Sequence, residues 1–160
     1  MGATRQDREA ITAEGLAALQ AELEELETSG RRAMAERIQA ARELGDLKEN
    51  AEYHIAKEDQ AHLETKIRRL RQRLGAAVVV EPDPSGTKLG FGRTAEVLDE
   101  TSGVQHTWTI VGATEANVAE GRLSSESPVA KALLGRAAGD TVTVDTPRGT
   151  RRYRVQRLIG

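Results

Sequence analysis

The sequence has no cysteine and very few aromatic residues: one Trp, two Tyr and one Phe in 160 residues. Without cysteine, the chain has no disulfide, no thiolate metal site and no cysteine nucleophile, and a reducing compartment suits it. The histidines His54, His62 and His106 are too scattered for a zinc site. The longest apolar run, Ala76–Val80, is too short to span a membrane, and the N-terminus lacks the apolar stretch of a signal peptide. These absences predict a soluble, cytoplasmic protein without membrane contact.

Charge and proline are unevenly placed along the chain. The formal net charge is only −2, from 23 basic and 25 acidic side chains. All four prolines follow Gly75, and the first half has few β-branched residues. An aliphatic core with few rings also favours long helices over an all-β sandwich. We therefore predict an α+β protein with two domains, a helical one over 1–76 and a mixed one over 77–160.

Apolar residues recur every three or four positions in two stretches of the first half. The first stretch (16–41) contains a run of fours that resembles a stutter, which unwinds a supercoil without breaking the helix. The second (53–74) is a regular heptad pattern. Because only Gly45–Glu49 separates them, we predict an antiparallel two-helix coiled coil with an acidic tip at 45–53 and a first helix ~50 Å long. In that pairing Leu26 faces Ile67.

The second half reads as short strands with one helix. Partial alternation predicts strands over 94–99, 105–111, 141–145 and 152–158, and a further strand begins the segment 76–92. Ser127 as the N-cap, Pro128 at the first helical position and Gly135 at the end predict one short helix.

The segment between the two expected helices is acidic, and the helix after it is basic. Residues 45–59 hold five acidic and two basic side chains, whereas residues 61–75 hold five basic and one acidic. Asp46 and Glu49 lie three residues apart where the second helix is expected to begin, a spacing that in a helix puts both carboxylates on one side. Oxygen ligands of this kind suit Mg²⁺ shared with a partner's ligands. The more common role of such acids is to complement the helix dipole.

The residues around this turn carry a family resemblance. The motif GDLKENAEYH at 45–54, together with LGFG at 89–92, TIVG at 109–112 and SPVA at 127–130, resembles the Gre family of bacterial transcript-cleavage factors over nearly the whole chain. The resemblance implies an N-terminal coiled coil and a C-terminal domain of FKBP-like fold. It also implies that the chain is not an enzyme itself but acts on RNA polymerase.

The resemblance assigns roles to the tip. It implies that the coiled coil enters the secondary channel of bacterial RNA polymerase, where Asp46 and Glu49 help to hold the second Mg²⁺ and its water. The polymerase then cleaves the 3′ end of the nascent, backtracked RNA and resumes elongation. The residues expected to contact RNA are Arg37, Arg42, Lys57 and Tyr53. Solvated basic side chains and a packing role for Tyr53 are the alternatives.

The resemblance also implies that Glu126, Ser127 and Pro128 dock on the polymerase, although Ser127 and Pro128 are equally explained as a helix N-terminus. We expect a monomer, because a hairpin that satisfies its own seam needs no partner helix. Two rival functions remain at this point: a Gre-like channel inhibitor without cleavage activity, and a coiled-coil scaffold for another protein.

Overall fold

The computed structural model describes residues 8–83 and 85–159, and contacts within it divide the chain into two compact units. The first unit contains residues 16–77, and the second combines residues 8–15 with the chain from Val78 onward. We predicted a first domain over residues 1–76. The structure groups residues 8–15 with the second unit, and the periodicity of the sequence did not indicate this grouping.

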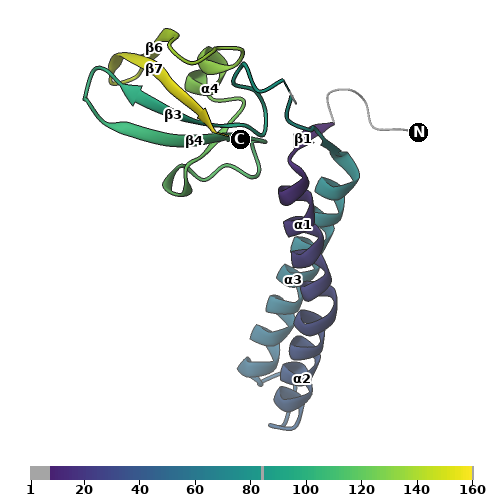
Figure 1. The fold of residues 1–160 in the computed structure, drawn as a ribbon. Coiled ribbons are helices and arrows are strands. Elements are labelled where there is room, and N and C mark those ends of the chain that lie inside the picture. Colours follow the sequence, from purple (N-terminus) through teal and green to yellow (C-terminus); the bar gives the residue numbers. More distant parts are fainter. Residues whose placement is uncertain (1–7, 84, 160) are drawn as a thin grey trace. The chain divides into compact units, whose positions relative to one another are not determined.

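The first unit is an antiparallel helical hairpin (Figure 1). Its first arm begins as α1 (Ala13–Glu25), passes through a π-helical turn, η2 (Leu26–Gly30), and continues as α2 (Arg31–Arg42). The second arm is α3 (Ala51–Ala76), which lies beside α2. The first arm therefore continues without interruption through the expected stutter. However, it takes up the irregular spacing as one π turn rather than as a slightly unwound α-helix.

The seam residues meet between the two arms. The buried residues of the first arm are Leu19, Ile38 and Ala41, and those of α3 are Ala56, Ile67 and Leu70. A Cβ placed on Gly30 would lie 3.7 Å from Cδ1 of Leu63. This contact agrees with the predicted pairing, because Leu26 facing Ile67 places Gly30 opposite Leu63.

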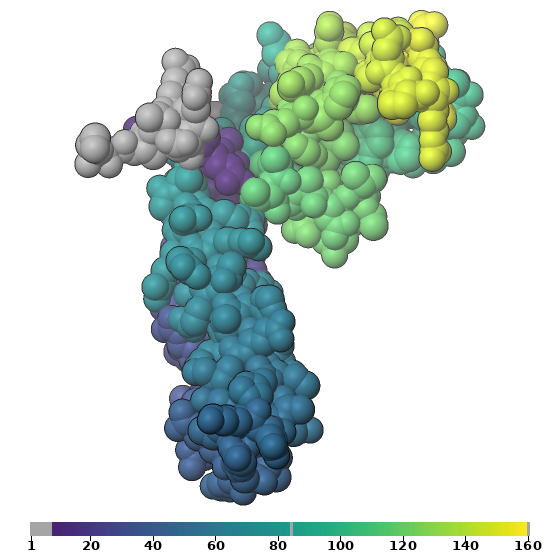
Figure 2. Space-filling model, turned by 180° about the vertical axis from the view of Figure 1, so that it is seen from behind, coloured from purple at the N-terminus to yellow at the C-terminus, as the bar shows by residue number. Residues whose placement is uncertain are grey.

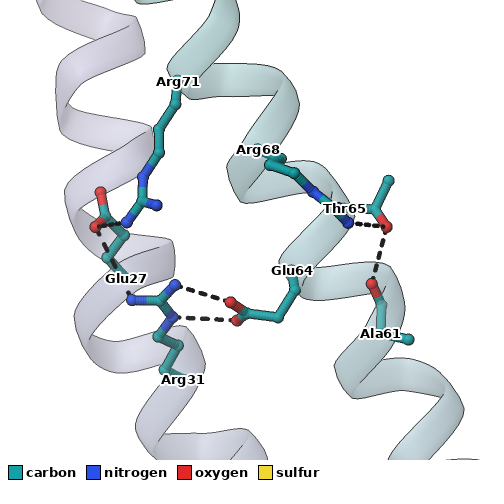
Figure 3. A network of polar contacts seen from close by, with 7 residues as sticks. All are labelled: Glu27, Arg31, Ala61, Glu64, Thr65, Arg68 and Arg71. Carbon is teal, nitrogen blue, oxygen red and sulfur yellow. Dashed lines mark hydrogen bonds and ion pairs between the residues drawn. The ribbon is translucent and has the colours of Figure 1, made fainter.

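A ladder of ion pairs crosses the seam beside the π turn (Figure 3). The Arg31 guanidinium donates to both carboxylate oxygens of Glu64, at 3.1 and 2.8 Å, and Arg71 donates to Glu27 at 2.6 Å. The hydrogen bond from Arg31 holds the pKa of Glu64 below its usual value, and the same bond raises the pKa of Arg31. These partners come from opposite arms, and their pairing agrees with the register that the apolar seam sets.

The second unit is built on a five-stranded sheet in the order β5-β4-β3-β7-β6. Its strands are β3 (Thr94–Asp99), β4 (Gln105–Val111), β5 (Arg122–Ser124), β6 (Thr141–Thr146) and β7 (Gly149–Ile159). All neighbours are antiparallel except β4 and β5. The four expected strands are confirmed. Strand β5 and the 3₁₀ turn η3 (Val118–Glu120) are too short to leave a periodic signal.

One face of this sheet forms the core of the second unit. Alternate residues of β3, β4 and β7 are buried on that face, among them Val97, Ile110 and Val155, each fully buried. Helix α4 (Pro128–Leu133) packs there through Ala130 and Leu133. As predicted, Ser127 caps this helix and Pro128 occupies its first turn. The opposite face of the sheet carries the half-buried residues of β3 and exposed residues of β4, β6 and β7.

Residues 8–15 are attached to the second unit by a short strand pairing and by one carboxylate. Strand β1 (Glu9–Ile11) pairs with β2 (Ala77–Val79) in a separate two-stranded sheet. Just after β1, the backbone N–H of Thr12 donates to Glu115 at 3.0 Å, and its hydroxyl donates to the same carboxylate. Glu115 also accepts from the N–H of Gly112 at 2.9 Å. One acid on the β4–β5 connection thus satisfies three donors.

The fold is of the predicted mixed α+β class, with a helical hairpin and a small β-sheet domain that carries one short helix. Within the described residues, no helix has both the length and the apolar composition needed to cross a membrane.

Candidate functional site

The turn between α2 and α3 lies at the end of the hairpin in both opposite views (Figures 1 and 2). After α2, Gly45 adopts a φ of +130°, a conformation that glycine tolerates best. Asp46 then bends the chain locally, because its Oδ1 accepts from the N–H of Lys48 at 3.0 Å. Helix α3 starts only after Asn50, whose side chain accepts from the N–H of Tyr53 at 3.1 Å.

The two acids are therefore placed differently from the expectation. We expected Asp46 and Glu49 at the beginning of the second helix, but that helix begins at Ala51, so the helical three-residue argument does not apply to them. The cap is at Asn50 rather than near residue 46, and the local turn at Asp46 holds 46–49 outside the helix. Both acids are exposed on this turn.

The side chains of both acids are open to solvent. Among the described residues, no ion pair involves the carboxylate of Asp46 or of Glu49. The described residues also contain no cluster of three or more His, Asp or Glu side chains that could hold a metal ion. Two open carboxylates fit Mg²⁺ as a partial ligand set, since this ion commonly takes one or two protein carboxylates and fills its other positions from elsewhere.

Of the expected RNA-contact residues, Arg42 and Tyr53 lie together beside the turn. The Arg42 guanidinium lies over the Tyr53 ring, with Cζ 5.8 Å from the ring centroid. Tyr53 is half-buried and meets His54 edge to face, at 5.6 Å between centroids. A cation over an aromatic face is attracted to it. This pair therefore joins the end of α2 to the first turns of α3.

The other two expected RNA-contact residues have partners within the hairpin. Arg37 donates to Asp59 at 2.6 Å across the seam, in a pair whose side chains are 46% and 42% exposed. Lys57 donates to Gln60 at 2.9 Å within α3. Both side chains are exposed, and such surface contacts are weak enough to be exchanged for another anionic or polar partner.

The expected docking residues form the connection between β5 and α4. The N–H and hydroxyl of Ser127 both donate to the carbonyl oxygen of Ser124, at 3.0 and 2.7 Å. The same hydroxyl accepts from the N–H of Ala130 at 3.2 Å, which caps α4. Glu126 and Pro128 on either side are exposed. Ser127 thus has a structural role, and the flanking residues present their side chains to solvent.

Sequence reasoning missed two features of the turn. Asn50 not only caps α3 but also donates through Nδ2 to the carbonyl oxygen of Ala41, a contact whose only sequence signal is an Asn directly before a helix. The apolar side chains of Leu44, Leu47 and Ile55 are 68%, 42% and 52% exposed around the acids. These three side chains do not lie at seam positions. Their spacing could therefore have identified them as exposed apolar residues.

Comparison with known proteins identifies the family. The model described as "Transcription elongation factor, N-terminal" matches residues 9–79, and the model described as "Transcription elongation factor, GreA/GreB, C-term" matches residues 83–158. The class of protein defined by this hairpin and sheet domain is thus a transcription elongation factor. The chain belongs to the GreA/GreB family.

Individual relatives match along most of the chain. It is 48% identical over 141 residues to the transcription elongation factor GreA of Roseiflexus castenholzii, which covers 88% of this chain and 90% of the relative. It is 45% identical over 152 residues to GreA of Nautilia profundicola, with 94% of both chains covered. The crystal structure of GreA factor homolog 1 (Gfh1) of Thermus thermophilus matches 96% of this chain and 99% of that chain at 32% identity and a TM-score of 0.42.

Proposed function

We propose that this elongation factor binds bacterial RNA polymerase, inserts its helical hairpin into the secondary channel and stimulates Mg²⁺-dependent endonucleolytic cleavage of the 3′ end of backtracked RNA. Arrested complexes would thereby resume elongation in the cytoplasm. The observation that carries this proposal is the pair of exposed carboxylates, Asp46 and Glu49, free of ion pairs with described residues on the end turn of a GreA/GreB-family hairpin.

In this proposal the chain lends ligands to an active site that belongs to the polymerase. Mg²⁺ bound there supplies a Lewis acid and an activated water for hydrolysis of the phosphodiester. The contribution of Asp46 and Glu49 is to complete the oxygen ligand set. Gly45 and Asn50 support them, because the turn conformation and the helix cap restrict where these carboxylates can go.

Basic and aromatic side chains next to the turn would hold the RNA end. Arg42 and Tyr53 offer a guanidinium and a ring close to the acids in sequence, and Arg37 and Lys57 add exposed positive charge further along each arm. Cations of this kind attract a phosphate backbone. Glu126, Ser127 and Pro128 would contact the polymerase from the second unit, with Glu126 and Pro128 as the exposed members.

The test is a transcript-cleavage assay on a stalled, backtracked elongation complex. The parent protein with Mg²⁺ should release short 3′ RNA fragments, and Asp46→Asn or Glu49→Gln should lower the maximal cleavage rate by about 10²-fold or more, as expected for loss of a ligand to a reacting centre. Binding to polymerase, measured separately by titration, should change less than about threefold because neither side chain is packed.

A matched control is Glu43→Gln, which removes an exposed acid at the end of α2, just outside the motif. Cleavage by this variant should remain at the parent level. Full cleavage by both ligand variants would refute the ligand assignment. Slower elongation by the parent without release of fragments would instead identify a channel inhibitor, and failure to bind polymerase would favour a scaffold.

A further inference from the structure

The backbone of Lys48 is held on both sides within the turn that carries the acids. Its N–H donates to Oδ1 of Asp46 at 3.0 Å. Its carbonyl oxygen lies 3.4 Å from Nε2 of His54, which belongs to α3. The described residues contain no other hydrogen bond from a helical side chain to the backbone of 46–49. The ring of His54 is therefore the hydrogen-bonded link between this stretch and α3.

The partner of His54 determines where its ring carries a hydrogen. A carbonyl oxygen can only accept, so Nε2 must be the donor in this contact. The neutral Nε2–H tautomer and the imidazolium both have that donor, whereas the Nδ1–H tautomer lacks it. The contact thus makes a definite statement about the neutral ring, namely that its hydrogen is on Nε2.

The His54 ring is oriented by its neighbours. The Tyr53 ring meets it edge to face, with 5.6 Å between the centroids and an angle of 69° between the planes. The guanidinium of Arg42, the last residue of α2, lies over the Tyr53 ring. Edge-to-face ring pairs and cations over ring faces are both attractive. A series of contacts therefore runs from the end of α2 through Tyr53 and His54 to the carbonyl of Lys48.

The two contacts of the Lys48 backbone affect both acids. Because a peptide unit is planar, the Lys48 carbonyl and the Glu49 N–H lie in one plane. Holding that carbonyl at His54 sets the plane from which Glu49 starts. On the other side, the Lys48 N–H holds the Asp46 carboxylate. The placement of one acid relative to the other thus depends on the backbone of a single residue between them.

We propose that His54 is a positioning residue, which holds the Lys48 carbonyl through Nε2–H while Tyr53 orients its ring. Held in this way, Asp46 and Glu49 keep the relative placement that a shared Mg²⁺ requires. The effect on cleavage rests on the proposed function, whereas the hydrogen bond is a property of the free protein. Placement is important because an error of about 1 Å at a reacting centre can lower the rate by about 10²-fold.

The first test is NMR spectroscopy of the full chain without polymerase. The ¹⁵N shifts of the neutral His54 ring should identify Nε2 as the protonated nitrogen. Backbone order parameters at 47–49 should be near the rigid value of about 0.85 in the parent and should fall to about 0.6 or lower in His54→Ala. Tyr53→Leu should lower them as well, a change that the loss of an RNA contact alone would not produce.

The second test is the transcript-cleavage assay. His54→Ala should lower the maximal cleavage rate by about tenfold and leave the half-saturating concentration of the factor within about twofold, because the side chain acts through the acids. His54→Gln keeps an N–H donor at a similar reach, so it should recover the rate to within about threefold of the parent. Circular dichroism melting verifies that each variant is folded.

The matched control is His62→Ala, which removes another exposed histidine about two turns further along α3. The nearest acidic group to the His62 ring is Glu58, at 3.8 Å, and no contact joins it to the turn. This variant should match the parent in the order parameters at 47–49 and in the cleavage rate.

Three outcomes would overturn the proposal: a neutral His54 ring protonated at Nδ1, order parameters at 47–49 that do not change in His54→Ala, and an equal loss of cleavage in the Gln and Ala variants. A parent protein that releases no RNA fragments would instead refute the proposed function. In that case, lowered order parameters in His54→Ala would still support His54 as the residue that holds the turn, and unchanged ones would overturn it.

Discussion

The side chain of Asn50 donates a hydrogen bond to the carbonyl oxygen of Ala41, and this bond joins the start of α3 to the last turn of α2. The same amide caps α3 through its oxygen, which accepts from the N–H of Tyr53. One residue therefore closes both helix ends at the turn that carries the acids.

Asn50→Ala should destabilise the protein by about 1 to 2 kcal/mol, because it removes a helix cap and a bond between the arms. Asn50→Asp keeps the cap acceptor but has no amide donor, and its loss should be smaller. Denaturant unfolding measures both values. Equal destabilisation by the two substitutions would mean that the cap contributes nothing and that only the bond to Ala41 matters.

Asp99 gives a prediction about acid stability. Burial raises the pKa of its carboxyl, but hydrogen bonds from Ser102 and from the N–H of Thr101, together with the charge of Arg151, outweigh burial and leave the pKa below its usual value. A carboxyl with a lowered folded pKa contributes stability above its unfolded pKa of about 3.9, and loses it as the pH falls through the folded value.

Asp99→Asn should therefore cost about 1 to 3 kcal/mol at neutral pH, and the gap between parent and variant should narrow as the pH falls from about 5 to about 2. Unfolding by urea across this pH range measures the gap. Glu81→Gln, at an exposed position, is the control and should run parallel to the parent. A gap that stays constant with pH would show that the carboxyl is not the titrating group.

Gly112 should not tolerate a side chain. A Cβ at this position would lie 2.2 Å from the carbonyl oxygen of Ala10, a backbone atom that cannot move aside alone. Gly112→Ala should destabilise the second unit by about 1 to 3 kcal/mol through overpacking. By contrast, a Cβ on Gly75 in α3 would have no heavy atom within 4 Å apart from its chain neighbours and the nearby helix backbone, so Gly75→Ala should stabilise the protein by about 0.5 to 1 kcal/mol. Thermal unfolding compares the two, and equal effects would contradict the close approach.

In the β5–α4 connection, the structural role of Ser127 can be tested separately from a docking role of Glu126. Ser127→Ala should cost about 1 kcal/mol because it removes the cap of α4, whereas Glu126→Ala should leave stability unchanged. If this loop docks on the polymerase, Glu126→Ala should weaken binding several-fold at unchanged melting temperature. Binding titrations and melting curves on the same samples check this, and unchanged binding would remove Glu126 from the interface.

The long elements could be predicted because their patterns are long. The heptad positions up to Leu70 define the hairpin, and the alternation around Val97 defines β3. Features that depend on tertiary contacts could not be predicted. The bonds from Thr12 to Glu115 span 103 positions in sequence. Likewise, the face of the sheet on which Arg157 lies depends on a register shift between β3 and β7.

At the candidate site, the identity of the acids came from the sequence but their setting did not. Asp46 and Glu49 lie between two helices, so their three-residue spacing is compatible with the start of a helix and also with a turn. The choice depends on which residue caps α3. Asn50 has the better geometry because its amide serves both arms, an advantage that exists only after the arms have paired.

The π turn at Leu26–Gly30 holds one more residue than an α-helical turn would, and this surplus has a consequence for how the arm can change in length. Deleting Thr28 or Ser29 would leave the apolar positions near a seven-residue repeat, so the arm could close up into a continuous α-helix that still faces α3. The same deletion near Ala35, with the π turn kept, would rotate everything beyond it by about 100°, carrying Ile38 and Ala41 out of the seam. The arm therefore has one place where it can lose a residue without turning its far end away.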